Sequence, residues 1–351
     1  KFGDDFTEIA IAVFVLNLSH HNPAAVGLVI SMMFWPRMLW GGIVAGIISR
    51  FHRKQLLLVS NIAHSILILS IPLIHQLWWA ITAMFLMYSL ASFYQPTINA
   101  ITPVIAEDTD MLSYSNATLS RRGGYADLLA YAIGGSFLIW LGFFAAFSID
   151  ALSYLLAAFL LLQIRRDEST WQPTAQEKSL SFRAQLAEGG KEYARNKTLL
   201  ALSGISFLIM LAISGINVLP APAMRTLWHQ PSAHFSWFLL AMALGVSVGS
   251  KLIEHRLHIN TFRRLMVSGL IGVGVVSVLL SYSTNIEEAL LLAFALGILN
   301  AFFMTTVMTW IQHVVPRHNL SRVFSLNGLL IGLGGGLGAI LSGTVAHAFT
   351  L

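Results

Sequence analysis

The sequence predicts an all-α polytopic membrane protein, and three observations support this fold class. Hydrophobic residues make up 56% of the 351 residues and charged residues only 11%, whereas a typical soluble domain is about a quarter charged. The mean hydropathy is +0.71. Long apolar runs recur along the whole chain, so most of the protein surface is expected to face lipid rather than water.

The apolar runs predict about eleven transmembrane helices, because a helix needs roughly 18 or more apolar residues to cross the hydrocarbon core. We expect these helices near residues 1–18, 23–49, 55–74, 77–104, 112–141, 143–164, 198–218, 233–254, 264–283, 287–314 and 322–349. One long polar interval separates six spans from five. We therefore predict an N-terminal transmembrane bundle at 1–164, a cytoplasmic linker at 165–197 and a C-terminal transmembrane bundle at 198–351.

The basic residues predict the orientation in the membrane. If span 1 starts in the cytoplasm, the loops on that side receive nearly all of the Lys and Arg residues between spans. These residues are Arg50, Arg53, Lys54, Arg165, Arg166, Lys178, Arg183, Lys191, Arg195, Lys197, Lys251, Arg256, Arg263, Arg264, Arg317 and Arg322. The opposite side receives only Arg225. Short cytoplasmic loops carry an excess of Lys and Arg, so this asymmetry also supports the span count.

Composition excludes several classes of protein. The absence of cysteine rules out a disulfide framework, a thiolate metal site and a cysteine nucleophile. The net charge of +5 does not indicate nucleic-acid binding, because the basic residues are scattered without a continuous stripe. No sequence pattern of an intramembrane hydrolase is present, so an enzyme is not expected. The expected partners are the lipid bilayer and a small-molecule substrate, with no cofactor.

Span 1 carries three carboxylates, and charged side chains inside a span usually face a protein interior or a water-filled cavity. Asp4 and Glu8 lie one helical turn apart on one face, and Asp5 is adjacent. A carboxylate pair in a partly dry cavity suits reversible proton binding. Alternatively, Asp4 and Asp5 lie at the cytoplasmic mouth and pair with loop cations, which makes Glu8 the stronger candidate.

Arg37 is predicted to lie near the middle of span 2, directly after Pro36, whose ring and missing N–H should bend the helix. A guanidinium at that depth needs an anionic partner. Glu8, Asp127 and the substrate are the candidates for that partner. Arg37 is therefore interpreted either as a cavity residue or as half of a structural ion pair.

Span 5 supplies Arg121, Arg122 and Asp127, with Gly123 and Gly124 between them. The glycines would allow close helix approach or a local break. Arg121 and Arg122 either serve the cavity or mark a cytoplasmic helix end whose side chains reach the headgroups. A helix end does not explain Asp127, so we predict that it takes part in substrate or proton binding.

The histidines do not predict a metal site. His20 and His21 adjoin each other at the outer end of span 1, but two ligands do not make a site, and a solvated turn is the simpler interpretation. His64 in span 3 is expected to be an interior histidine with satisfied hydrogen bonds. The glycines around Gly334 in span 11 precede no Lys-Ser/Thr pair, so they indicate a close-packing helix face.

Five segments carry a family resemblance. They are KFGDDFTEIAIAVFVL in span 1, AGIISRFHRK between spans 2 and 3, YQPTINAITPVIAEDTDMLSYSNATLS from span 4 to span 5, FSIDALSYLLAAFLLLQIRR in span 6 and WIQHVVPRHNLSRVFSLNGLLIGLGGGLGAILSG from span 10 to span 11. Together they resemble signatures of the major facilitator superfamily, in its enterobactin exporter and macrolide efflux branch.

The resemblance implies a major facilitator fold of two pseudo-symmetric six-helix bundles, with span 12 and the start of span 1 missing from this sequence. It implies a secondary active transporter, working by alternating access as a proton-coupled exporter of an amphipathic siderophore or drug-like molecule. The proton gradient would be the energy source. The alternatives are a lysophospholipid or other lipid transporter and, in another class, a non-transporting receptor or scaffold. We expect a monomer in the bacterial inner membrane.

The resemblance also assigns residues to roles. It places Arg50, Arg53 and Lys54 in a cytoplasmic gate, although Ser49 replaces the Asp of that signature, so the gate lacks this anion.

Two further positions matter in the comparison with the family. Ala130 and Tyr131 replace the Gly-Pro of the antiporter motif in span 5. Asp150 matches a scaffold signature, which implies a structural hydrogen bond.

Overall fold

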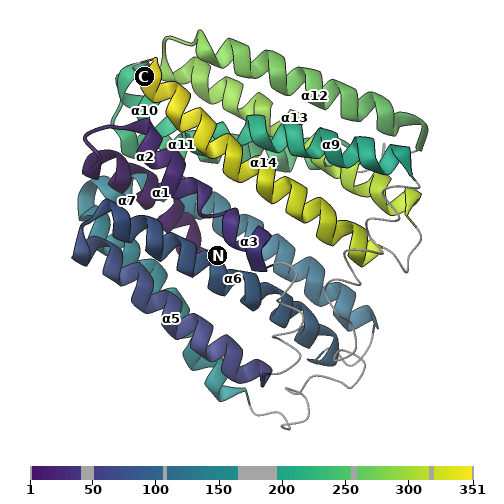
Figure 1. Ribbon diagram of the computed structural model, residues 1–351, viewed down its shortest axis with the longest axis horizontal. Helices are drawn as coiled ribbons and strands as arrows, with labels where there is room; N and C mark the ends of the chain where they lie inside the picture. The colour runs from purple at the N-terminus through teal and green to yellow at the C-terminus, as the bar shows by residue number, and fades with distance from the viewer. Residues whose placement is uncertain are drawn as a thin grey trace.

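The computed structural model describes residues 2–40, 51–105, 109–164, 196–253, 259–315 and 320–349. Every regular element in this part of the chain is helical, and the long helices run side by side as a bundle (Figure 1). This arrangement confirms the predicted all-α class. The predicted linker lies almost wholly outside the described residues, and the division of the chain into domains stays a prediction.

The helices fall into two sequence groups on either side of the predicted linker. The first group is α1 (Phe2–Leu18), α2 (Pro23–Ser31), α3 (Trp35–Trp40), α5 (Arg53–Ile74), α6 (Leu77–Ile105) and α7 (Thr109–Gln163). The second group is α9 (Lys197–Ile213), η2 (Ser214–Asn217), α10 (Pro220–Thr226), η3 (Ser232–His234), α11 (Phe235–Ile253), α12 (Ile259–Ser281), α13 (Ile286–Val314) and α14 (Leu320–Ala348).

Nine stretches of the described residues are long and apolar enough to cross a membrane. Two features explain why this number is lower than the predicted eleven. The stretch Arg122–Gln163 has 42 residues, which make about 63 Å of helix, or twice the ~30 Å of hydrocarbon. α1 has 17 residues and therefore falls just short of the 18 required.

α7 is a helical hairpin with its turn at Gly142. Its first arm places Tyr131 beside Glu8 in the second turn of α1. Its second arm returns to the same turn of α1, where Asp150 accepts a hydrogen bond from Thr7. In a straight helix, the 19 residues from position 131 to 150 would span about 28 Å. Gly142 has φ 78° and ψ 179°, a conformation almost restricted to glycine. The turn confirms the predicted boundary between spans 5 and 6.

Span 2 is not the continuous helix that the hydropathy predicts. α2 ends at Ser31, and residues 32–34 form a turn before α3 begins at Trp35. The N–H of Phe34 donates to the carbonyl of Ser31, three residues back, at 3.0 Å. The helix breaks here because Pro36 has no N–H for the carbonyl of Met32. The bend predicted at Pro36 is therefore a break one turn earlier, and the predicted residues 41–49 lie outside the described part of the chain.

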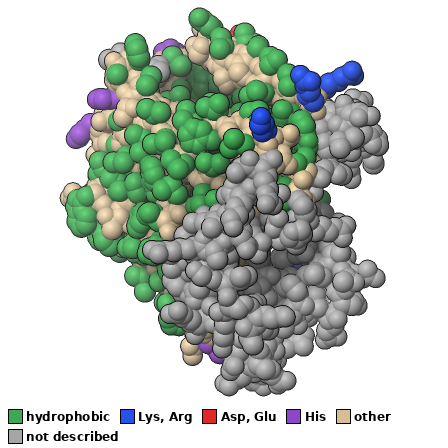
Figure 2. Space-filling view, turned by 45° about the vertical axis from the view of Figure 1, so that its right-hand side comes forward, with side chains coloured by type: hydrophobic (Ala, Val, Ile, Leu, Met, Phe, Trp, Pro, Cys, Tyr) green, Lys and Arg blue, Asp and Glu red, His purple; other side chains and the backbone are tan. Residues whose placement is uncertain are grey.

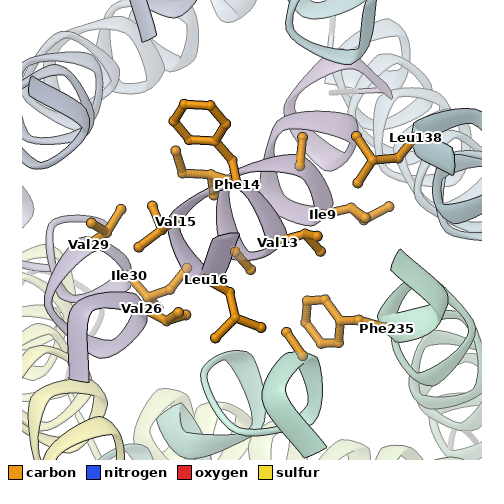
Figure 3. Close-up of a cluster of buried hydrophobic side chains, with 14 of the residues drawn as sticks. Ile9, Val13, Phe14, Val15, Leu16, Val26, Val29, Ile30, Leu138 and Phe235 are labelled. Atoms are coloured by element: carbon orange, nitrogen blue, oxygen red, sulfur yellow. The ribbon is translucent and has the colours of Figure 1, made fainter. Parts of the chain in front are cut away.

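α1 is buried along most of its length. Every residue from Ile9 to Leu16 is buried, as expected for a helix that is apolar on all sides. Figure 3 shows its side chains directed towards α2, α7 and α11, where Val26, Leu138 and Phe235 lie. The charged residues of α1 are confined to its first two turns, so they mark one end of this core.

Small residues allow the two groups of helices to pack closely. The main contacts between the groups join α2 with α14 and α7 with α11. A Cβ on Gly27 would lie 3.1 Å from the Cα of Gly343, across the boundary between the two groups. Within the second group, a Cβ on Gly334 would lie 2.5 Å from the carbonyl oxygen of Phe207 on α9. These approaches confirm the close-packing face predicted for span 11.

The outer surface of the bundle is apolar. Figure 2 shows one face of the molecule, where hydrophobic side chains cover most of the described surface and few charged residues lie between them. Trp140 is 83% exposed and Leu291 is 70% exposed. An apolar surface of this extent is expected of a protein whose solvent is lipid.

Candidate functional site

A cavity of about 920 Å³ lies among α1, α3, α5, α6 and α7. It brings together three of the residues predicted from sequence, namely Asp4, Glu8 and Arg37. Its ionisable and aromatic lining residues are Asp4, Asp5, Glu8, Arg37, His64, Tyr88, Tyr94, Asp150 and Tyr154. Within the described part of the wall, four carboxylates and one guanidinium give an excess of negative charge when the carboxyl groups are ionised.

Asp5 and Glu8 form one cluster with Tyr131. The Tyr131 hydroxyl lies 3.2 Å from Oε2 of Glu8 and 3.5 Å from Oδ1 of Asp5, so it bridges the two carboxylates. Asp5 is only 4% exposed, and the alternative that it pairs with loop cations at the cytoplasmic mouth stays a prediction. Tyr131 occupies the position where the antiporter motif has Pro. That departure was the signal in the sequence that could have identified it.

Asp4, His64 and Asp150 form a second cluster, held by α1, α5 and α7. One ligand atom from each residue lies within 4.8 Å of the others. The Tyr154 hydroxyl donates to Oδ1 of Asp4 at 2.8 Å. The Tyr154 ring stacks on His64 with a centroid distance of 3.8 Å.

The prediction that His64 has satisfied hydrogen bonds is wrong. Its Nε2 atom is buried and has no hydrogen-bond partner among the described residues. Asp150 is fully buried, and its Oδ2 accepts a 2.6 Å hydrogen bond from Thr7. This bond agrees with the structural role implied for Asp150. Gly3 makes the approach possible, since an added Cβ there would lie 2.5 Å from Oδ1 of Asp150.

Arg37 projects from α3 into the cavity wall. Its Cζ atom lies 5.9 Å from the centroid of the Tyr88 ring, a distance typical of a cation–π contact. The break before α3 separates this residue from the packed helix α2. Arg37 therefore presents a positive group to the same cavity as Glu8, in agreement with its interpretation as a cavity residue.

The predicted residues of span 5 lie elsewhere. Arg122 is exposed and Asp127 is half-buried, and neither belongs to the cavity lining. Arg121 lies within α7, but its side chain is outside the described part of the structure. Asp127 sits one turn before Tyr131 on the same arm of α7. Roles for these three residues in substrate or proton binding stay predictions.

The predicted gate cations are only partly described. Arg50 lies outside the described residues, and Arg53 is buried at the start of α5. Lys54 donates to the carbonyl oxygens of Leu162 at 3.4 Å and Ile164 at 2.9 Å. A cation at a helix C-terminus satisfies its unpaired carbonyls. Lys54 thus ties α5 to the end of α7, and its part in a gate stays a prediction.

The opposite end of the bundle carries a contact between the two helix groups. The guanidinium of Arg225 on α10 donates to Nε2 of His21 in the turn after α1. Burial lowers the pKa of His21, and the positive charge of Arg225 and the neighbouring His20 lower it further. The neutral imidazole that accepts this bond is therefore favoured. His20 and His21 are both exposed in this turn, as predicted, and His21 also contacts a distant segment.

The Major Facilitator Superfamily model matches residues 2–339. The chain belongs to the major facilitator superfamily. Among its relatives is Macrolide efflux protein A of Streptococcus pyogenes, which is 22% identical over 331 residues covering 89% of this chain and 78% of that protein. Another is the multi-drug resistance efflux pump PmrA of Streptococcus pneumoniae, which is 24% identical over 370 residues covering 99% of this chain and 88% of that protein.

Solved structures of this superfamily share the fold. A bacterial homologue of the human lysosomal transporter Spinster, in an inward-facing and unoccupied conformation, matches with a TM-score of 0.76. The match has 18% sequence identity and covers 99% of this chain and 81% of that one. The predicted major facilitator fold is therefore confirmed. As a member of this superfamily, the chain is a multi-pass membrane transporter and not an enzyme.

Proposed function

We propose that this major facilitator protein is a proton-coupled exporter of amphipathic small molecules in a bacterial inner membrane. The observation that carries the proposal is the 920 Å³ cavity with Asp5 and Glu8 in its wall. Cavities that take small ligands measure about 300–1,000 Å³. Ionisable residues inside membrane spans are characteristic of proton relays and substrate pathways. One compartment thus offers room for a cargo and groups that bind a proton.

Coupling follows from competition for the carboxylates of α1. When Glu8 is ionised, the Tyr131 hydroxyl donates to it and ties α1 to the first arm of α7. A proton on Glu8 removes the negative charge that this bond depends on. A polar or cationic group of the cargo competes with the proton for the same oxygens. Release of one would therefore favour binding of the other, which is the requirement for antiport.

Alternating access is supported by the distribution of contacts between the helix groups. Gly27 of α2 packs on Gly343 near the end of α14, and His21 meets Arg225 at the same end. Under the predicted orientation, this end faces away from the cytoplasm. The arrangement corresponds to an inward-facing state with the outer end closed, the state named for the Spinster homologue. The second state would separate these contacts.

The cargo is inferred from the chemistry of the cavity wall. Tyr88, Tyr94 and Tyr154 provide aromatic surface beside the acidic residues. Such a wall suits a molecule with an apolar body and polar or basic groups. Efflux of a macrolide and of several drugs is named for the two relatives, which supports export and a drug-like cargo.

The proposal is tested by transport in proteoliposomes with an imposed pH gradient. Uptake of a macrolide, a siderophore and a lysophospholipid would be compared, together with acidification measured by an internal dye. We expect gradient-driven transport of the macrolide by the unaltered protein. Glu8→Gln should reduce it by at least tenfold, because the amide cannot exchange a proton. Glu287→Gln, at an exposed position on α13, is the matched control and should transport normally.

Three results would contradict the proposal in whole or in part. If Glu8→Gln retained full gradient-driven transport, the cavity carboxylate would not couple the proton. If only the lysophospholipid moved, the protein would be a lipid transporter. Transport that ignores the pH gradient would leave the cavity as a substrate site but remove the coupling.

A further inference from the structure

We propose that Asp4, His64 and Asp150 form a binding site for a first-row divalent metal ion such as Mn²⁺ or Zn²⁺. The three residues come from α1, α5 and α7 and line one cavity. One ligand atom from each lies within 4.8 Å of the others. Metal–ligand bonds of about 2.0–2.2 Å place neighbouring ligand atoms roughly 3–3.5 Å apart, so a small side-chain rotation would close the set.

His64 supplies the observation that points to a ligand. The residue is 7% exposed, and its buried Nε2 has no hydrogen-bond partner among the described residues. A buried polar group normally has a partner, because leaving it without one costs about 1–3 kcal/mol. The other members of the set lie within reach of one of its ring nitrogens. A metal ion bound by the imidazole would fix the orientation of the ring and explain its place between two carboxylates.

Neighbouring groups orient the ligands in the way that metal sites require. Thr7 donates to Oδ2 of Asp150, which leaves Oδ1 with one weak 3.4 Å bond from Ser153. Tyr154 donates to one oxygen of Asp4 and stacks on the His64 ring. Thr7 and Tyr154 thus hold the orientation of the two carboxylates.

The local charge favours a cation. Among the described residues that line the cavity there are four carboxylates and one guanidinium, that of Arg37. Two carboxylates and one imidazole are a ligand set for Mn²⁺, Fe²⁺ or Zn²⁺ rather than for soft ions, which prefer sulfur ligands. Water molecules in the cavity would complete the coordination. The site would tie together the three helices α1, α5 and α7.

The test is equilibrium metal binding to the purified full chain without a histidine tag. Isothermal titration with Zn²⁺ and electron paramagnetic resonance of Mn²⁺ should each show one bound ion per chain. In a separate thermal unfolding measurement, binding should raise the melting temperature. His64→Gln and Asp4→Asn should each weaken binding at least tenfold. His347→Gln removes an exposed imidazole on α14 and should bind as the unaltered protein does.

The results of this test distinguish the metal-site proposal from the transport proposal. Normal melting temperatures of the metal-free variants would show that they fold. Unchanged binding in both His64→Gln and Asp4→Asn, or no stoichiometric binding in the unaltered chain, would overturn the proposal. Because binding is measured without a membrane gradient, failure of proton-coupled export would leave this result intact.

Discussion

The hairpin turn of α7 gives the sharpest test of the fold. Gly142 has φ 78° and ψ 179°, a region of backbone space that is essentially restricted to glycine and costs other residues about 1–3 kcal/mol. A Cβ at this position meets no other atom within 4 Å, so Gly142→Ala changes the backbone energy without creating a clash. We expect this substitution to lower the free energy of unfolding by about 1–3 kcal/mol.

Gly124 is the matched control, because it lies on the first arm of the same helix and a Cβ there also meets nothing within 4 Å. Its backbone is helical, so Gly124→Ala should stabilise the protein by about 0.5–1 kcal/mol. Reversible unfolding in mixed micelles with increasing SDS, followed by circular dichroism, would compare the two variants. The same unfolding midpoint for Gly142→Ala and Gly124→Ala would refute the conformation assigned to the turn.

Two further predictions concern single hydrogen bonds. Thr7→Val removes the donor to fully buried Asp150 and should lower the unfolding free energy by about 1.5–3 kcal/mol in the same assay. Thr344→Val, at an exposed position on α14, should change it little, and equal effects would contradict the importance of the buried bond. The His21 contact with Arg225 should depend on pH. The pKa of His21 is lowered from 6.5 by burial and by Arg225, so the contact is present above 6.5 and is lost as the pH falls through the lowered value. Spin labels on single cysteines in the α1–α2 turn and in α10 should move apart at low pH, and His21→Gln should abolish this change. Constant label distances from pH 8 to pH 4.5 would show that this contact does not hold the outer end closed.

The sequence predicts the fold well because its strongest signal is a property of single segments. An apolar run long enough to cross lipid specifies a helix without knowledge of its neighbours. The hydropathy therefore locates the helices to within a few residues, and it separates the two arms of α7 at Gly142. It fails in span 2 because hydropathy does not register a backbone hydrogen bond. Ser31 and Trp35 lie in one apolar run, yet the helix breaks between them because Pro36, the next residue, has no N–H to donate.

The site is harder to predict because its contacts join distant segments. Glu8 and Arg37 are identifiable from sequence, since each is a charge in an apolar run. His64 and Asp150 also interrupt apolar runs, but they are 86 residues apart and only the hairpin of α7 brings them together. Nothing in the spacing of these two residues indicates a shared site. For the same reason, no partner for Tyr131 can be predicted from the sequence, although its hydroxyl donates a hydrogen bond to Glu8 in the structure.

The first two turns of α1 show how one helix can serve two sites. Asp5 and Glu8 are three residues apart and face the first arm of α7, where Tyr131 bridges them. Asp4 and Thr7 share the same spacing one residue earlier, about 100° around the helix, and face the second arm through Tyr154 and Asp150. The sequence pairs Asp4 with Glu8 because residues four apart also share a face. The hairpin, with an arm on each side, assigns them to different partners. Loss of Glu8 should therefore impair proton coupling while metal binding remains.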